Sequence, residues 1–263
     1  MKLWIQLPSQ RGKDKVQFRP YLETLEKVKR PDTEVSFQSV PAGPGLSSLD
    51  GFGYYGLRFM NDREILRNAS RAPAEGFDGV VIACYFDPAV RAARQLIPLP
   101  VVGIAEASML LANMMGLRFA VVTSDRRYVE DMVETIHLYG MEARAIAQRP
   151  VRAIGMSEGE FLACLSGNFG PLMEDFSEVA RTCVQDGAQV IIAGCGLMSP
   201  ALTQAGLLQV QDAPVVDPVI AGIKVAEMMV ELKRAGLPVL SRRGIFEEVP
   251  SEVYERARIS GLL

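Results

Sequence analysis

The sequence reads Gly-Phe-Asp-Gly-Val-Val-Ile-Ala-Cys at residues 76–84 and Gly-Ala-Gln-Val-Ile-Ile-Ala-Gly-Cys at residues 187–195. Each stretch is a short apolar run, typical of a buried parallel strand, that ends in a cysteine. In both places a capping residue and a proline follow within five positions, then a helix-like segment, and then Pro-Val-Val opens the next apolar run. The same order of parts occurring twice predicts two copies of one βαβ unit, and hence an internal duplication.

The two cysteines, Cys84 and Cys195, occupy equivalent places in the duplicated unit. Asp87 and Ser199 are good helix N-caps, and the proline after each suits the first position of a helix. We expect each cysteine to lie in the turn between the carboxyl end of a strand and the amino end of a helix. Ligands of open α/β sheets bind at that edge, so both cysteines are candidate site residues.

Beyond these units, short apolar runs alternate with helical patterns along the chain, which predicts the α/β class with parallel sheets. The expected strands are residues 3–7, 34–39, 79–83, 101–103, 119–123, 142–146, 190–193 and 215–216. Residues 40–56 are too rich in glycine and proline for a regular element, and we expect a long loop there. Such a loop is either a binding loop or lid, or a plain surface connection.

With 263 residues the chain is long enough for one large or two smaller α/β domains. Its composition, 49% hydrophobic and 22% charged, is that of a folded globular protein. The net charge of -3 and the lack of a lysine or arginine tract argue against a nucleic-acid partner, so the expected ligand is a small molecule. The first residues form no signal-peptide pattern and no run reaches membrane-spanning length, which favours a cytoplasmic protein without a membrane partner.

Four cysteines occur singly, without a Cys-x-x-Cys pair, so neither a disulfide framework nor a structural zinc site is indicated. The one histidine, His137, lies in a charged helical stretch and is expected to be an exposed structural residue. Cys164 and Cys183 lie in amphipathic helical stretches and are expected to pack in the interior. No metal site, no nucleotide-binding fingerprint and no cofactor are therefore expected.

A single cysteine at the end of an apolar strand is more often a packing residue than a reactive one. A pair at equivalent points of a duplicated unit, each facing the positive end of a helix that lowers a thiol pKa, suits a site with two thiols. Racemisation of a carbon next to a carbonyl group needs a base on one face to remove a proton and an acid on the other to return one. Cys84 and Cys195 could supply both, and backbone amides in the turns after them could stabilise the enolate charge.

The duplicated units are part of a longer series of motifs. The series consists of Gly43-Pro44, residues 76–84, Phe86-Asp87-Pro88, Ala92-Ala93-Arg94, and residues 100–107, 119–123, 138–142, 194–198 and 214–217. In this order and spacing the motifs resemble the aspartate/glutamate/hydantoin racemase superfamily, most closely its hydantoin racemase branch, over most of the chain.

The resemblance implies two similar α/β lobes, each a parallel sheet flanked by helices, with the active site in the cleft between them. The chain would cross to the second lobe near residues 105–110 and return near residues 212–217. One lobe would then comprise residues 1–106 and 213–263, and the other residues 107–212.

By position, Cys84 and Cys195 resemble the two acid/base cysteines of that superfamily, which needs no cofactor and commonly self-associates into homo-oligomers. Thr123 and Ser124 correspond to its substrate-anchoring hydroxyl groups, although both also suit ordinary N-capping of the helix that includes residues 128–138. The remaining residues expected to bind substrate are Ser9 and, through their backbone amides, Tyr85, Gly196 and Leu197.

Two segments depart from the hydantoin racemase pattern. Leu7-Pro8-Ser9-Gln10 stands where that branch has a strand followed by Asn-Pro-Asn, which changes the polar groups facing the substrate. Tyr85-Phe86-Asp87-Pro88-Ala89 replaces Phe-Gly-Asp-Pro-Gly, which adds a bulky aromatic ring at the cleft. The sequence therefore leaves the identity of the substrate open.

The sequence favours a cofactor-independent racemase that acts at the acidic carbon of a hydantoin-like or amino-acid-derived substrate. Two other reactions fit the same scaffold: cis-trans isomerisation through a covalent thiol adduct, and decarboxylation of a malonate, which needs only one of the two thiols. A small-ligand binding protein without catalysis is a further alternative, because a two-lobed fold does not determine function.

Overall fold

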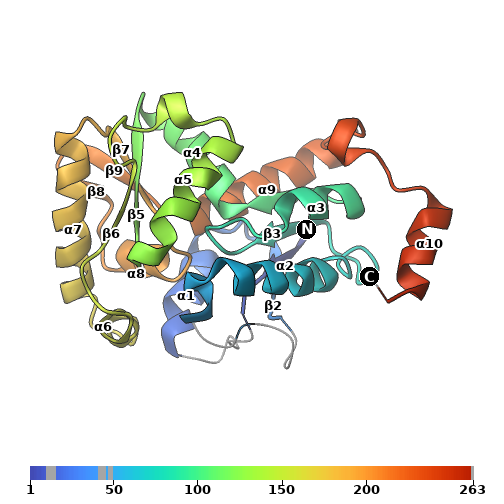
Figure 1. Cartoon of the computed structure of the whole chain (residues 1–263), viewed down its shortest axis with the longest axis horizontal. Coiled ribbons are helices and arrows are strands. Elements are labelled where there is room, and N and C mark those ends of the chain that lie inside the picture. The colour runs from blue at the N-terminus through green and yellow to red at the C-terminus, as the bar shows by residue number, and fades with distance from the viewer. Residues whose placement is uncertain (10–15, 41–45, 47–49, 262–263) are drawn as a thin grey trace.

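The computed structural model describes residues 1–9, 16–40, 46 and 50–261, and its strands form two sheets (Figure 1). The first sheet has the parallel order β2-β1-β3-β4, with β1 (Lys2–Gln6), β2 (Glu34–Gln38), β3 (Gly79–Ile82) and β4 (Val101–Gly103). The second has the parallel order β6-β5-β7-β9, with β5 (Phe119–Thr123), β6 (Val151–Ala153), β7 (Val190–Ala193) and β9 (Ala213–Val216). A short strand, β8 (Gln209–Val210), pairs antiparallel with β9 at the edge. The predicted α/β fold is confirmed, and β3 and β7 hold the same place in their sheets.

Helices flank both sheets and connect their parallel strands (Figure 1). Those near the first sheet are α1 (Arg19–Val28), α2 (Tyr55–Ala69) and α3 (Val90–Leu96), and those near the second are α5 (Val129–Leu138), α6 (Glu158–Cys164), α7 (Gly170–Gln185) and α8 (Met198–Gln204). Two longer helices, α4 (Ile104–Met115) and α9 (Pro218–Arg234), pack against each other, and α4 contacts strands of both sheets. The last helix, α10 (Ser251–Ile259), stands apart from the body of the molecule in Figure 1.

One hydrophobic core runs through both sheets. It includes Ile5 and Val81 from the first sheet and Val121 and Ile192 from the second, all at most 1% exposed. A second cluster packs the other face of the second sheet against α6 and α7, and a third packs the first sheet against α2 and α3. Because close-packed interiors deform little, the shared core holds the carboxyl ends of β3 and β7 in a defined relation.

The strand predicted at residues 142–146 is wrong. Residues Glu142–Arg144 form a 3-10 turn, and Ala145 makes only an isolated bridge to Phe119. Gly140, with φ 67, ends α5 in the left-handed conformation, and the chain forms a continuous ladder with β5 only at β6. Strand β6 was not predicted because it is three residues long and has Arg152 at its centre, and the still shorter β8 was not predicted either.

The capping prediction for Asp87 and Ser199 is also wrong. Ser199 lies inside the first turn of α8, whose N-cap is Leu197. The Asp87 carboxylate accepts hydrogen bonds from the backbone amides of Ala105 and Glu106, at 2.9 Å each, in the first turn of α4. The fold brings the turn that contains Asp87 to a helix that begins later in the chain, so local spacing could not identify the helix it caps.

Gly103 explains why α4 takes its cap from elsewhere. The matching residue of the second unit is Asp217, which caps its own helix by accepting from the amides of Val219 at 2.8 Å and Ile220 at 3.4 Å. A Cβ atom on Gly103 would lie 2.2 Å from Oδ2 of Asp87. Glycine therefore leaves room for a carboxylate from another turn at the place where the second unit carries its own.

Sheet pairing also refines the division of the chain. β9 pairs with β7 in the second sheet, whereas the expected return at residue 213 would assign it to the first lobe. Residues 41–45 and 47–49 of the long loop predicted at residues 40–56, which include Gly43-Pro44, lie outside the described residues. Within the described part, residues Asp50–Gly53 form a 3-10 turn and α2 already begins at Tyr55.

No helix of the described residues is long and apolar enough to span a membrane.

Candidate active site

The turns that carry the two cysteines lie against each other. Cys84 comes two residues after the last residue of β3, and Cys195 two residues after the last residue of β7. A Cβ atom on Gly196 would lie 3.3 Å from the carbonyl oxygen of Ala83, so each cysteine has a neighbour that touches the other turn. The carboxyl ends of equivalent strands thus meet, as expected for ligand sites of parallel sheets.

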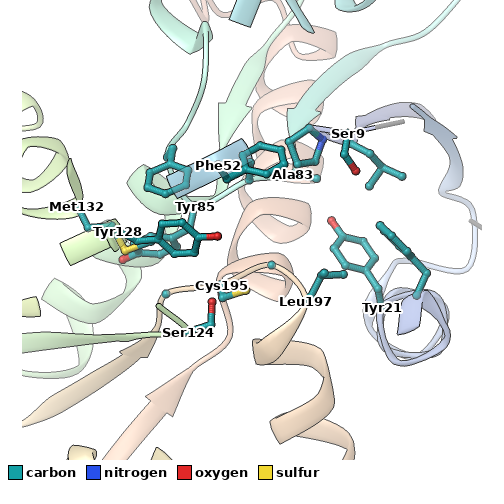
Figure 2. A pocket seen from close by; sticks show the side chains of 17 residues that line it. Ser9, Tyr21, Phe52, Ala83, Tyr85, Ser124, Tyr128, Met132, Cys195 and Leu197 are labelled. Atoms are coloured by element: carbon teal, nitrogen blue, oxygen red, sulfur yellow. The ribbon is translucent and has the colours of Figure 1, made fainter. Parts of the chain in front are cut away.

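Both cysteines line one cavity, which holds about 690 Å³ of space including its open mouth. Figure 2 shows Ser9, Phe52 and Ala83 on one side of this space and Ser124, Cys195 and Leu197 on the other. Most of the wall is apolar or aromatic, with a few hydroxyl groups, as in sites for small organic ligands. The lining residues are Leu7, Pro8, Ser9, Phe18, Tyr21, Phe52, Ala83, Cys84, Tyr85, Phe86, Ser124, Tyr128, Met132, Gly194, Cys195, Gly196 and Leu197.

The Cys84 thiol is in an environment that disfavours its ionisation. Burial raises the pKa of this thiol to about 12, and the backbone amide of Phe86, which hydrogen-bonds to the sulfur, lowers it only in part. Negative charge on Cys195, Asp62 or Asp87 raises the pKa further. A free thiolate at Cys84 therefore needs a compensating positive charge.

Cys195 lies among apolar and hydroxyl groups. Ser124, Tyr128 and Met132 line the cavity on its side (Figure 2). Its carbonyl oxygen accepts a hydrogen bond of 2.9 Å from the amide of Ser199, so the turn leads directly into α8. That helix begins three residues after the cysteine.

The two hydroxyl groups expected to anchor substrate have different positions. Ser124 lines the cavity, whereas Thr123 is fully buried and is not among the lining residues. The Oγ1 atom of Thr123 donates to the carbonyl oxygen of Gly194 at 3.2 Å, which ties the end of β5 to the turn of Cys195. Neither residue is an N-cap, because Asp125 takes that role by accepting from the amide of Arg127 at 2.8 Å.

The structure brings Ser9, Tyr85, Gly196 and Leu197 together in the cavity wall. The ring of Tyr85 packs on the turn of the opposite lobe, since a Cβ atom on Gly194 would lie 3.4 Å from its Cε1. Within the described part of the chain, the backbone amides of Gly196 and Leu197 donate to no carbonyl or side chain. They are therefore free to donate to an oxygen atom of a bound ligand.

Several lining residues were not predicted from the sequence. Tyr21 from α1 and Tyr128 from the turn before α5 lie on opposite sides of the space in Figure 2, and Phe52, Phe86 and Met132 complete the wall. The amphipathic pattern of α1 predicts that Tyr21 faces inward, yet only the packing of the two lobes directs it to a site. No local motif marks these residues.

The remaining cysteines and the histidine behave as predicted. Cys164 in α6 and Cys183 in α7 are buried in the core of the second sheet, and His137 at the end of α5 is exposed. Among the described residues, no three His, Cys, Asp or Glu side chains gather closely enough to hold a metal ion.

Comparisons with known proteins agree with this geometry. Residues 49–226 match the family model described as Asp/Glu/Hydantoin racemase. The chain is 32% identical to a hydantoin racemase of Pseudomonas sp. (strain NS671) over 203 residues, covering 77% of this chain and 76% of that protein. It is 31% identical to a hydantoin racemase of Rhizobium meliloti over 211 residues, covering 79% and 81%. Among solved structures, the allantoin racemase from Klebsiella pneumoniae superposes with a TM-score of 0.78 at 28% identity, covering 95% of this chain and 94% of that chain.

Proposed function

The chain belongs to the Asp/Glu/hydantoin racemase family, which makes it an isomerase, and we propose that it inverts a hydantoin-like substrate with Cys84 and Cys195 as its acid and base. The observation that carries this proposal is that both cysteines line one cavity, one from each sheet. Two thiols on opposite lobes can reach opposite faces of a carbon held between them. That is the arrangement that proton removal from one face and proton return to the other require.

The proton balance needs no further reactant. In one direction the Cys195 thiolate removes the proton from the acidic carbon, and the electrons of the broken C–H bond move into the neighbouring carbonyl group. The Cys84 thiol then gives its proton to the opposite face of the carbon and becomes the thiolate. The reverse direction exchanges the two roles, so each turnover leaves the protonation of the pair reversed.

The enolate oxygen formed in this step needs hydrogen-bond donors. The amides of Gly196 and Leu197, which donate to no acceptor among the described residues, are candidates for this task. Preorganised donors at such a position typically contribute about 2.7–4 kcal/mol to transition-state stabilisation. Ser124 and Ser9, one from each side of the cavity, are placed to hold the polar edge of the substrate.

The class of substrate is proposed from two observations. The relatives named hydantoin and allantoin racemases act on five-membered rings with an acidic carbon, and this cavity has an apolar wall with few polar groups. A compact ring with two amide groups suits that wall better than an amino acid, whose two charged groups would lack paired charges along it. We therefore favour 5-substituted hydantoins over aspartate or glutamate.

Proton NMR in deuterated water tests the function. The protein is incubated with single enantiomers of 5-substituted hydantoins, allantoin, aspartate and glutamate, and the signal at the acidic carbon is followed together with optical rotation. We expect exchange and loss of rotation with a hydantoin, and no loss of rotation in the Cys84→Ala or Cys195→Ala variant. Undiminished racemisation in either variant would sink the two-thiol proposal. Exchange with no substrate of the set, and turnover of an unsaturated diacid or a malonate instead, would replace it by isomerisation or decarboxylation.

A further inference from the structure

A second pocket reaches Cys84 from the side of α2. It shares Phe52, Cys84 and Phe86 with the cavity described above, so these residues separate the two spaces. Its other walls come mainly from α2 and α5 and carry four charged side chains. Those side chains are Arg58 and Asp62 on α2, and Asp131 and Glu134 on α5.

Arg58 is the unusual member of this group because it is a buried cation. Its residue is 8% exposed, it forms an ion pair with Asp131, and its guanidinium group lies over the ring of Phe86 at 4.3 Å from the ring centre. Its Nη1 atom is buried and has no hydrogen-bond partner among the described residues. A buried, incompletely paired guanidinium is costly, and such groups are often retained for function.

The burial of Nη1 argues against a role in ligand binding. An atom with no access to the pocket cannot donate to a molecule that occupies it. In addition, the acidic residues Asp62, Asp131 and Glu134 outnumber the single cation in the pocket wall, so an anionic ligand would be repelled. The charge of Arg58 therefore acts on other groups of the protein rather than on a ligand.

Cys84 is the group on which that charge acts. Both side chains line the same pocket, and the ring beneath the guanidinium group belongs to Phe86, two residues after Cys84. A fixed positive charge beside a thiol favours the thiolate. In agreement with this placement, burial lowers the pKa of the Arg58 guanidinium and an ionised Cys84 raises it again. Arginine stays protonated over the whole working range, so this effect is constant with pH.

The chemistry of the site requires such a charge. In one direction of the proposed reaction Cys84 must act as the base, and burial alone would keep it protonated. We propose that Arg58 is the positioning residue that stabilises the Cys84 thiolate, with Asp131 and Phe86 holding the guanidinium in place. This role rests on the proposed function for its purpose, but the charge effect can be measured on Cys84 without any substrate.

Other ionisable groups near Cys84 also affect its pKa. Asp62 is one helical turn after Arg58 on α2, and its carboxylate opposes the thiolate. Burial raises the pKa of Asp62 to about 7, so it is ionised where thiols are titrated. The remaining groups whose charge is coupled to that of Cys84 are Asp87, Cys195 and Tyr21. Removing the charge of Asp62 should therefore shift the pKa of Cys84 in the direction opposite to removing the charge of Arg58.

The test is the rate of alkylation of Cys84 by iodoacetamide from about pH 6 to pH 11, with Cys84 and Cys195 peptides quantified separately by mass spectrometry. This range lies below the Cys84 midpoint, where the rate is proportional to the thiolate fraction, so the ratio of two rates at fixed pH gives the shift of the midpoint between variants. In Arg58→Met we expect the Cys84 midpoint to rise by about one pH unit, a tenfold lower rate at fixed pH. In Arg58→Lys, which keeps the charge, most of the shift should be rescued. In Asp62→Asn the midpoint should fall. Arg63→Met, an exposed arginine on the same helix, is the matched control and should leave it unchanged.

Two further measurements keep the test decisive. If Arg58→Met does not fold, the double variant Arg58→Met/Asp131→Asn removes the ion pair as a unit and leaves no unpaired carboxylate. An unchanged Cys84 midpoint in a folded variant without the cation would overturn the proposal. Racemisation by the unmodified protein is assayed in parallel: activity without a midpoint shift refutes the role of Arg58 alone, and a shift without activity refutes only the proposed function.

Discussion

Cys84 and Cys195 follow equivalent strands of two similar sheets, yet their side chains have different neighbours. Charged groups surround Cys84: Arg58 and Asp62 reach it from α2, and burial raises its pKa to about 12. Cys195 lies beside hydroxyl and apolar groups and just before the start of α8. The repeated unit thus supplies two thiols at matching positions, whereas the chain around each unit determines which groups act on each thiol.

The same lesson holds for the helices that leave the two sheets. After β9, Asp217 caps α9 and also accepts a hydrogen bond from Oγ1 of Thr203 at 2.8 Å. After β4, Gly103 takes the corresponding place and Asp87 supplies the carboxylate from the turn that follows Cys84. One unit caps its helix with its own aspartate, and the other links the turn that follows Cys84 to the helix. The second arrangement couples the position of the Cys84 turn to α4.

The largest expected effect comes from removing each thiol in turn. Cys84→Ser and Cys195→Ser should each lower racemisation by about 10²–10⁴-fold, the usual contribution of a general acid or base. Each variant keeps one base on one face, so each should still exchange the acidic proton of one enantiomer with solvent, and the two variants should prefer opposite enantiomers. Exchange of separate D and L substrate in deuterated water measures this preference, with Cys164→Ser as a control for the loss of a buried thiol.

A shared preference would break the comparison between the two thiols. If both variants exchanged the same enantiomer, the two cysteines could not lie on opposite faces of the carbon. If the preferences are opposite, the exchange rates of the two variants then compare the two thiols as bases. Exchange by the variant that keeps Cys195 should be the faster of the two near neutral pH, because the raised pKa of Cys84 makes its thiolate rare.

The next effect concerns the stability of the carboxylate cap at Asp87. Burial raises the pKa of Asp87 to about 7, and the hydrogen bonds from Glu106, Ala105 and Tyr139 oppose this only in part. Between the ordinary carboxyl pKa near 4 and this value the folded state binds the extra proton, so the stabilisation is complete below pH 4 and is lost as pH rises through 7. The free energy of unfolding of the unmodified protein, relative to Asp87→Asn, should therefore fall between pH 4 and pH 8. Urea unfolding of both proteins over that range measures it, and a difference that does not vary with pH would contradict the raised pKa.

Residues whose role depends on their immediate neighbours in the chain could be predicted from the sequence. An apolar run followed by a cysteine and a turn proline is such a pattern, and it identified β3, β7 and both cysteines. The hydroxyl of Ser124 was likewise expected to face the site, and it does line the cavity. Each of these features is set within about ten residues of the chain.

Residues whose role depends on the approach of distant segments could not be predicted. Asp87 caps a helix that begins after another strand, and Arg58 reaches Cys84 only because α2 packs beside the turn after β3. Both contacts follow from how the helices pack on the first sheet, which no local pattern of Asp or Arg encodes. Strand β6 was missed for a related reason: a three-residue strand with Arg152 at its centre lacks an apolar run, and pairing with β5 alone defines it.

The smallest effect separates the two adjacent hydroxyl residues after β5. Ser124→Ala should raise KM for the substrate by roughly 2- to 12-fold with little change in unfolding free energy, the range expected for one hydrogen bond of about 0.5–1.5 kcal/mol. Thr123→Val should affect stability rather than substrate binding, because the Thr123 hydroxyl donates a hydrogen bond to Gly194 and is not exposed in the cavity. It should lower the unfolding free energy by about 1 kcal/mol and leave KM nearly unchanged. Steady-state kinetics and urea unfolding of both variants measure the two effects. A KM effect of equal size in both would mean that Thr123 also reaches the substrate, and that the turn of Cys195 rearranges when the substrate binds.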